Sequence, residues 1–167
     1  MGTPTAYHQI GQFIAYFQHA EEKINELLVL LANADDEVIR ILVNELNFSQ
    51  RIKTADVVLA RFVDLQREPE LSAKAEFHTL MIELGKLGER RNELVHSQYA
   101  TWLNIEGSEG LIRQNSKLRA KKGIREENEE ELLPETFNTD LERIEKTLNQ
   151  LEAFRLRIID WLCGGEQ

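Results

Sequence analysis

The chain has 167 residues, the usual size of one domain, and its 42% hydrophobic residues suffice for a core without a disulfide or a structural metal. The single cysteine, Cys163, excludes an internal disulfide and every multi-cysteine zinc site. The net charge of −9 argues against a general nucleic-acid binder, because phosphate attraction usually leaves a basic footprint. No apolar run reaches the roughly 20 residues that cross a bilayer, and residues 1–8 lack a signal-peptide pattern. We therefore expect a cytoplasmic protein that makes no membrane contact.

Apolar residues at helical spacing predict three helices in the first part of the chain. The first runs from about Ala6 to Ala32, and Asp35 is a candidate cap for the second. Asn47 opens the cap signal of the third helix, and Pro69 ends that unit. The apolar stripes consist of Ile10, Phe13, Ile14, Phe17, Ile24, Leu27, Leu28 and Leu31, then Val38, Ile41, Leu42 and Leu46, then Ile52, Ala55, Val58, Leu59, Phe62 and Val63.

A fourth helix is predicted from Leu71 or Ser72 to at least His96. Gly85 and Gly88 lie inside it, and each costs about 1 kcal/mol relative to alanine. The cost predicts that another helix or backbone segment approaches closely there. The core side consists of Phe77, Leu80, Met81, Leu84, Leu87, Leu94 and Val95.

The pattern then changes, and residues 99–119 predict a short β-hairpin insertion. The 120s are interpreted as a mobile loop. In a final helix, Thr139 and Glu142 form a capping-box pair, and Gly164 marks the end. The predicted fold is therefore all-α: a single domain over residues 1–167, built as a bundle of four to five helices with the hairpin as an insertion.

A basic run lies just before an acidic run in this insertion. We consider two interpretations: a solvated loop whose opposite charges compensate, or a local basic patch that guides a polyanion. The basic residues are Arg113, Lys117, Arg119, Lys121, Lys122 and Arg125, and the acidic run spans residues 126–131.

Arg91, Asn92 and His96 form the one cluster of the sequence that suggests a specific chemistry. Arginine holds a phosphate through a planar fork of donors, and histidine, with an unperturbed pKa of about 6.5, can exchange a proton near neutrality. Asn92 and His96 are four residues apart and share a helix face. Arg91 and His96 lie about 140° apart around the axis. A second copy of the helix, from a partner chain, could close that gap.

The segment from Arg91 to His96, Arg-Asn-Glu-Leu-Val-His, resembles the signature of the HEPN superfamily of helical nucleases. That signature is an arginine, then a polar residue, then a histidine four to six residues after the arginine, late in a long helix. The resemblance implies metal-independent RNA cleavage, with no cofactor, at a composite site in a homodimer. It implies that Arg91 holds the phosphate, Asn92 positions it, and His96 transfers a proton as a ribose 2′-hydroxyl attacks. A protein partner such as an antitoxin, and a role in toxin–antitoxin systems or defence, are compatible with it.

Other residues are candidates for supporting roles or RNA contacts: Glu22, Arg90, Ser97, Arg113, Lys117 and Arg119. Glu21 and Glu22 are candidate partners for Arg90 or Arg91. Glu93 and His96 also have the Glu-x-x-His spacing of di-iron bundles, but the second half of that ligand set is missing. A different class of function stays open: a non-catalytic helical interaction or regulatory module, which the acidic composition favours.

Overall fold

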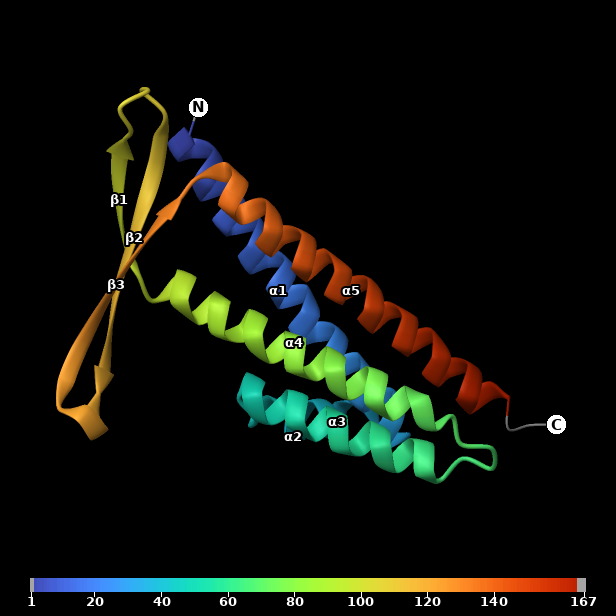
Figure 1. Ribbon diagram of the computed structural model, residues 1–167. Coiled ribbons are helices and arrows are strands. Elements are labelled where there is room, and N and C mark those ends of the chain that lie inside the picture. Colours follow the sequence, from blue (N-terminus) through green and yellow to red (C-terminus); the bar gives the residue numbers. More distant parts are fainter. Residues whose placement is uncertain (1, 165–167) are drawn as a thin grey trace. The chain divides into compact units, whose positions relative to one another are not determined.

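The computed structural model describes residues 2–164, which divide into two compact units. The helical unit comprises residues 16–88 and 145–164, and the sheet unit comprises residues 2–15 and 89–144. The elements follow the order α1 (Gly2–Ala32), α2 (Asp36–Asn44), α3 (Phe48–Asp64), α4 (Leu71–Val95), β1 (Gln98–Leu103), β2 (Glu109–Arg119), the 3-10 turn η1 (Ala120–Lys122), β3 (Ile124–Leu132) and α5 (Pro134–Cys163) (Figure 1). No helix within residues 2–164 is both long and apolar enough to cross a membrane.

Predicted caps begin both short helices of the helical unit. The Asp35 carboxylate accepts a hydrogen bond from the Val38 N–H at 3.0 Å. Asn47 and Gln50 exchange side-chain and backbone hydrogen bonds of 2.9 and 3.0 Å, a complete capping box. Both cap predictions are confirmed. The unit's core is apolar and includes Phe17, Ile24, Leu27, Leu59, Phe77, Leu84, Leu87, Leu151 and Ile158.

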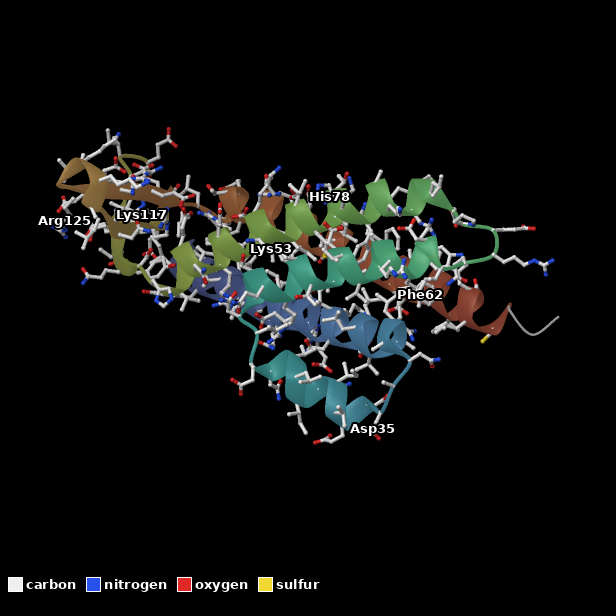
Figure 2. All side chains as sticks on the ribbon, turned by 90° about the horizontal axis from the view of Figure 1, so that it is seen from below. Asp35, Lys53, Phe62, His78, Lys117 and Arg125 are labelled. Atoms are coloured by element: carbon white, nitrogen blue, oxygen red, sulfur yellow. The ribbon has the colours of Figure 1, made fainter. Side chains whose placement is uncertain are left out.

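The apolar stripe predicted for the second helix does not form a core face. Val38, Ile41 and Leu42 are each more than half exposed, whereas Val43 is the residue of α2 that is buried. Figure 2 shows side chains of α2 directed away from the rest of the helical unit, with Asp35 labelled at the start of the helix.

Packing within the helical unit explains Gly88 but not Gly85 of α4. A Cβ atom built on Gly88 would lie 2.9 Å from the ring carbon Cε1 of Phe48, and that ring packs edge-on against Phe17 with centroids 4.8 Å apart. A Cβ atom on Gly85 would meet only Ile52 Cδ1, at an ordinary 3.6 Å. The predicted close approach is therefore confirmed at Gly88, where α3 passes α4.

The sheet unit contains a three-stranded antiparallel sheet in the order β1-β2-β3, so the all-α prediction is wrong. The hairpin predicted at residues 99–119 is confirmed as β1 and β2, with Tyr99 opposite Arg113. The mobile loop predicted in the 120s is wrong, because η1, Gly123 in the left-handed region (φ 63°) and β3 occupy it. β3 pairs with β2 over residues 124–132.

Cross-strand charge pairs explain how a glutamate-rich segment becomes a strand. Glutamate is a poor strand former, but opposite charges on neighbouring strands stabilise a sheet. Glu130 lies opposite Arg113, and Glu126 lies opposite Lys117. Two glutamates of β3 form ion pairs with cations of β2: Glu130 with the directly opposite Arg113, and Glu126 with Arg119, each at 2.8 Å.

Two helix boundaries also differ from prediction. α5 begins at Pro134, five residues before the predicted cap Thr139. Proline suits the first turn of a helix, because its missing N–H would have no partner there. α4 ends at Val95, so His96 lies in the turn that follows it. The predicted end at Gly164 is confirmed, and its N–H donates to the Asp160 carbonyl at 2.8 Å.

The two glycines predict opposite effects of alanine. Gly88→Ala should lower the free energy of unfolding by about 1–3 kcal/mol, because the new methyl group overpacks against the Phe48 ring. Gly85→Ala is the matched control and should raise it by up to about 1 kcal/mol through helix propensity. Urea titration of both variants measures the difference. Equal effects would contradict the close approach of α3 at Gly88.

Candidate functional site

His96 and Asn92 lie one helical turn apart at the carboxyl end of α4. The His96 N–H donates to the Asn92 carbonyl at 3.0 Å, and both side chains are exposed. Together they line an open hollow of about 440 Å³ between the end of α4 and strand β2, here called the His96 hollow. The other lining residues are Glu89, Glu93, Asn115, Ser116 and Lys117. The structure thus brings the predicted Asn92 and His96 together, with a lysine beside them.

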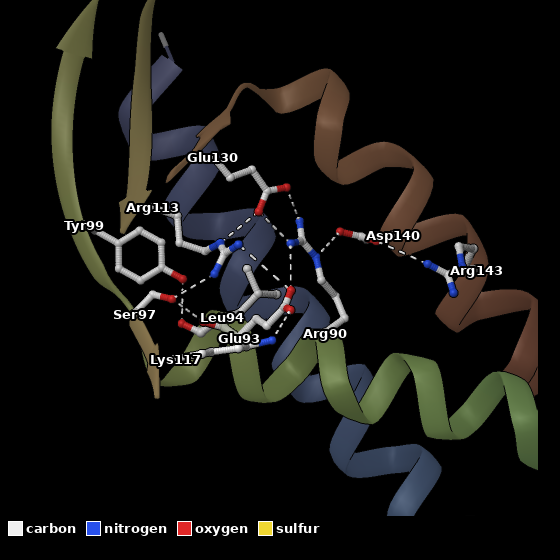
Figure 3. A network of polar contacts seen from close by, with 10 residues as sticks. All are labelled: Arg90, Glu93, Leu94, Ser97, Tyr99, Arg113, Lys117, Glu130, Asp140 and Arg143. Carbon is white, nitrogen blue, oxygen red and sulfur yellow. Dashed lines mark hydrogen bonds and ion pairs between the residues drawn. The ribbon is translucent and has the colours of Figure 1, made fainter. Parts of the chain in front are cut away.

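Side-chain hydrogen bonds fix the turn that carries His96 (Figure 3). The Ser97 hydroxyl donates to the Glu93 carbonyl and accepts from Nη1 of Arg113 at 3.1 Å. The Tyr99 hydroxyl donates to the Leu94 carbonyl at 2.5 Å. Burial raises the pKa of the Tyr99 phenol, which keeps this donor protonated. The backbone on both sides of His96 is therefore held in place.

Glu130 on β3 lies between two guanidinium groups. Its two carboxylate oxygens accept from Nη1 and Nη2 of Arg90 at 2.7 and 2.9 Å, and one of them also accepts from Nε of Arg113 at 2.8 Å. Nε of Arg90 donates to Asp140 on α5 at 2.8 Å. We call these four residues the Arg90–Glu130 network, and it joins α4, β2, β3 and α5 within the sheet unit (Figure 3).

The network shifts the ionisation of its members. Burial disfavours the charge of Arg90, but the hydrogen bonds that its guanidinium donates to the carboxylates of Glu130 and Asp140, together with the charges of those carboxylates, outweigh burial and raise the pKa of Arg90 above its ordinary value. Burial likewise opposes the Glu130 carboxylate, but hydrogen bonds from Arg90 and then Arg113 lower its pKa below 4.5. Arg113 itself is buried, with only 5% of its surface exposed. Arg90 and Glu130 therefore stay charged at neutral pH, and their ion pair joins α4 to β3.

The remaining predicted site residues lie in different settings. Arg91 is half-buried on α4 and does not line the His96 hollow. Lys117 is half-exposed, and its ammonium lies 3.2 Å from the Glu93 carboxylate. Arg119 pairs with Glu126 at 2.8 Å on the exposed hairpin.

Glu22, a candidate partner for Arg90 or Arg91, accepts hydrogen bonds from other residues. Glu22 accepts from Arg40 at 2.8 Å and from Asn25 at 3.1 Å within the helical unit. The carboxylates that hold Arg90 are Glu130, Asp140 and, at 3.7 Å, Glu93.

Sequence reasoning missed Glu130, Asp140, Tyr99 and Asn115. Glu130 and Tyr99 reach the site through strand register, and the one available signal was the matching of basic and acidic positions around Gly123. Asp140 lies one residue after the mistaken cap Thr139, so it was not considered as a buried partner.

The di-iron interpretation of Glu93 and His96 has an electrostatic obstacle. The Glu93 carboxylate lies within 4 Å of cationic groups of Lys117, Arg90 and Arg113, at 3.2, 3.7 and 3.9 Å. Three positive charges around a carboxylate disfavour a further cation. Within residues 2–164, no group of three histidine, cysteine or acidic side chains is arranged to hold a metal ion.

Three comparisons with known proteins returned no match: no family model, no curated protein and no solved structure matches the chain.

Glu130 predicts a pH dependence of stability. Because its pKa is lowered in the fold, its contribution is present above the ordinary value of 4.5 and is lost as the pH falls through the folded value. Glu130→Gln should lower the free energy of unfolding at pH 7 by about 2 kcal/mol, since Arg90 and Arg113 lose a charged partner. The difference from the parent should shrink below pH 4.5, as urea titrations at several pH values would measure.

Glu127→Gln is the matched control, since that carboxylate is exposed and pairs with Arg125 at the surface, at 2.7 Å. Its effect should stay below about 1 kcal/mol with little pH dependence. A Glu130→Gln variant as stable as this control at pH 7 would show that the network contributes nothing to the fold.

Proposed function

We propose that this protein is a HEPN-like, metal-independent RNA endonuclease whose reacting groups are Arg91, Asn92 and His96. The observation that carries the proposal is the placement of His96: an exposed imidazole on a turn fixed by hydrogen bonds, beside Asn92 and an open hollow. A general acid or base must be accessible to substrate and held in a defined position. The resemblance of the segment from Arg91 to His96 to the HEPN signature supports the choice of RNA.

The proposed reaction is attack by a ribose 2′-hydroxyl on the adjacent phosphorus. A bond forms from the 2′-oxygen to phosphorus as the 2′-hydroxyl loses its proton. The bond from phosphorus to the 5′-oxygen breaks, and the departing 5′-oxygen gains a proton. The products are a 2′,3′-cyclic phosphate and a 5′-hydroxyl end. His96 assists the proton transfer, Asn92 orients the phosphate through its amide, and Arg91 stabilises the charge that gathers on the phosphate oxygens.

The geometry favours two chains at one reaction centre. Arg91 and His96 are five residues apart, about 140° around the helix axis, and Arg91 does not line the His96 hollow. A homodimer that brings α4 of one chain to α4 of another would bring Arg91 of one chain to His96 of the other. Gly85 and Gly88 of α4 do not mark a dimer contact, because Phe48 and Ile52 of the same chain occupy the space beside them.

His96→Ala tests the assignment of the reacting histidine. With EDTA present, the parent should cut a labelled mixed-sequence RNA, and His96→Ala should cut it about 10²–10⁴-fold more slowly, because proton transfer is lost. His78→Ala is the matched control: His78 is an exposed histidine in the helical unit that pairs with Asp56, and its loss should leave cleavage unchanged.

Two outcomes would contradict the proposal. If folded His96→Ala cut as fast as the parent, the catalytic assignment would be wrong. If the folded parent cut no RNA, the chain would be better explained as a non-catalytic interaction module.

A further inference from the structure

Strand β2 has an open edge that begins beside His96. The first residue of β1, Gln98, lies opposite Gln114, so among residues 2–164 no strand pairs with β2 on that side from Asn115 to Arg119. On its other side, β2 stays paired with β3 over the same residues. Figure 1 shows the β2–β3 ribbon continuing beyond the start of β1. An open edge exposes backbone N–H and C=O groups that can bind an extended chain.

His96 lies at the head of this edge. It lines the His96 hollow together with Asn115 and Ser116. It also lines a second hollow of about 280 Å³, whose other lining residues include Asn115, Ser116, Gln98, Arg125 and the acidic Glu127 and Glu129. The Asn115 Oδ1 atom is a buried acceptor without a hydrogen-bond partner among the described residues, which favours binding of a ligand that brings a donor, as a ribose hydroxyl does. The edge and the proposed reacting group therefore share one surface.

The ribbon beyond His96 carries an excess of positive charge. Residues 115–128 contain five lysines and arginines and two glutamates, in a chain whose net charge is −9. Lys117, Arg119 and Arg125 have carboxylate partners at 3.2, 2.8 and 2.7 Å. Lys121 and Lys122 are exposed in η1, and no carboxylate of the described residues forms an ion pair with either. Figure 2 labels Lys117 and Arg125 on this hairpin.

The positive charge of the β2 edge favours binding of a polyanion over pairing with another β-strand. A second copy paired antiparallel, edge to edge and centred on Lys117, would place that lysine directly opposite its own counterpart, and like charges directly opposite across strands are destabilising. Lysine on an edge also discourages strand addition. A sugar–phosphate backbone instead supplies negative charge along its length and hydroxyl groups as donors.

We propose that the open β2 edge, from Asn115 to the turn with Lys121 and Lys122, is a track for the backbone of a single RNA strand leading away from His96. This proposal rests on the function proposed above for its choice of RNA. The strand part of the track, Asn115 to Arg119, spans about 13 Å at roughly 3.3 Å per residue. The two lysines of η1 then hold phosphates distant from the one that is cut.

Binding to RNA in the His96→Ala protein tests the track without cleavage. The probe is a fluorescently labelled single-stranded RNA of about a dozen nucleotides, within the range such sites cover, and its affinity is measured by anisotropy over a salt series. Lys121→Ala with Lys122→Ala should weaken binding and reduce the slope of log affinity against log salt by about 1.4, since each phosphate contact on a single strand contributes about 0.7. A dinucleotide is too short to reach η1, so it should bind equally to the His96→Ala protein with and without the two lysine substitutions.

The matched control is Lys53→Ala with Lys146→Ala, which removes two exposed lysines outside the sheet unit. This control should keep the affinity and salt slope of the His96→Ala protein. An unchanged affinity and slope in the η1 variant, or no binding of RNA by the folded protein, would overturn the track. Cleavage by the parent is measured separately. RNA binding with the expected slope but no cutting would disprove the nuclease alone, and cutting with an unchanged slope would disprove the track alone.

Discussion

A single carboxylate, that of Glu130, accepts hydrogen bonds from two arginines that arrive from different elements, Arg90 on α4 and Arg113 on β2. Burying such charges is costly unless each is paired and fully hydrogen-bonded. Two further acceptors provide such hydrogen bonds here. The Asp140 carboxylate accepts a hydrogen bond from Nε of Arg90, and the Ser97 hydroxyl accepts one from Nη1 of Arg113. The strands, the start of α5 and the end of α4 must therefore hold one arrangement for these charges to be tolerated in the sheet unit. The turn with His96 takes its position from that arrangement, because the hydroxyl of Ser97 is part of it.

Neighbouring residues have different roles as a result. The carboxylates of Glu130 and Asp140 neutralise Arg90, and Arg113 is buried with Glu130, so neither serves a polyanion. Two of the candidates for RNA contact thus belong to the fold. The cations left at the surface are those of the distal ribbon, where Lys121 and Lys122 stand without acidic partners among the described residues. An acidic chain can still present a local positive surface where its basic residues cluster in sequence, as they do from Lys117 to Arg125.

Local signals in the sequence predicted several local features correctly, although the capping box expected at Thr139 and the buried stripe expected on α2 were wrong. The caps Asp35 and Asn47 and the close approach at Gly88 each depend on short-range chemistry that the residues display directly. Strand β3 was not predicted, because its glutamate-rich composition disfavours a strand. It forms a strand through its pairing with β2. For the site, the sequence brought Asn92 and His96 together, but it could not show that Arg90 would be neutralised, because Glu130 and Asp140 lie 40 and 50 residues further along the chain.

Mixing two inactive variants tests the central claim, a reaction centre shared between Arg91 of one chain and His96 of another. Arg91→Ala and His96→Ala proteins are each assayed for RNA cleavage in EDTA, then mixed, allowed to exchange subunits and assayed again. The account predicts that each variant alone is inactive and that the mixture regains cleavage, because a mixed dimer restores one intact centre. Two inactive variants whose mixture stays inactive, with exchange verified by a mass tag, would contradict the shared site.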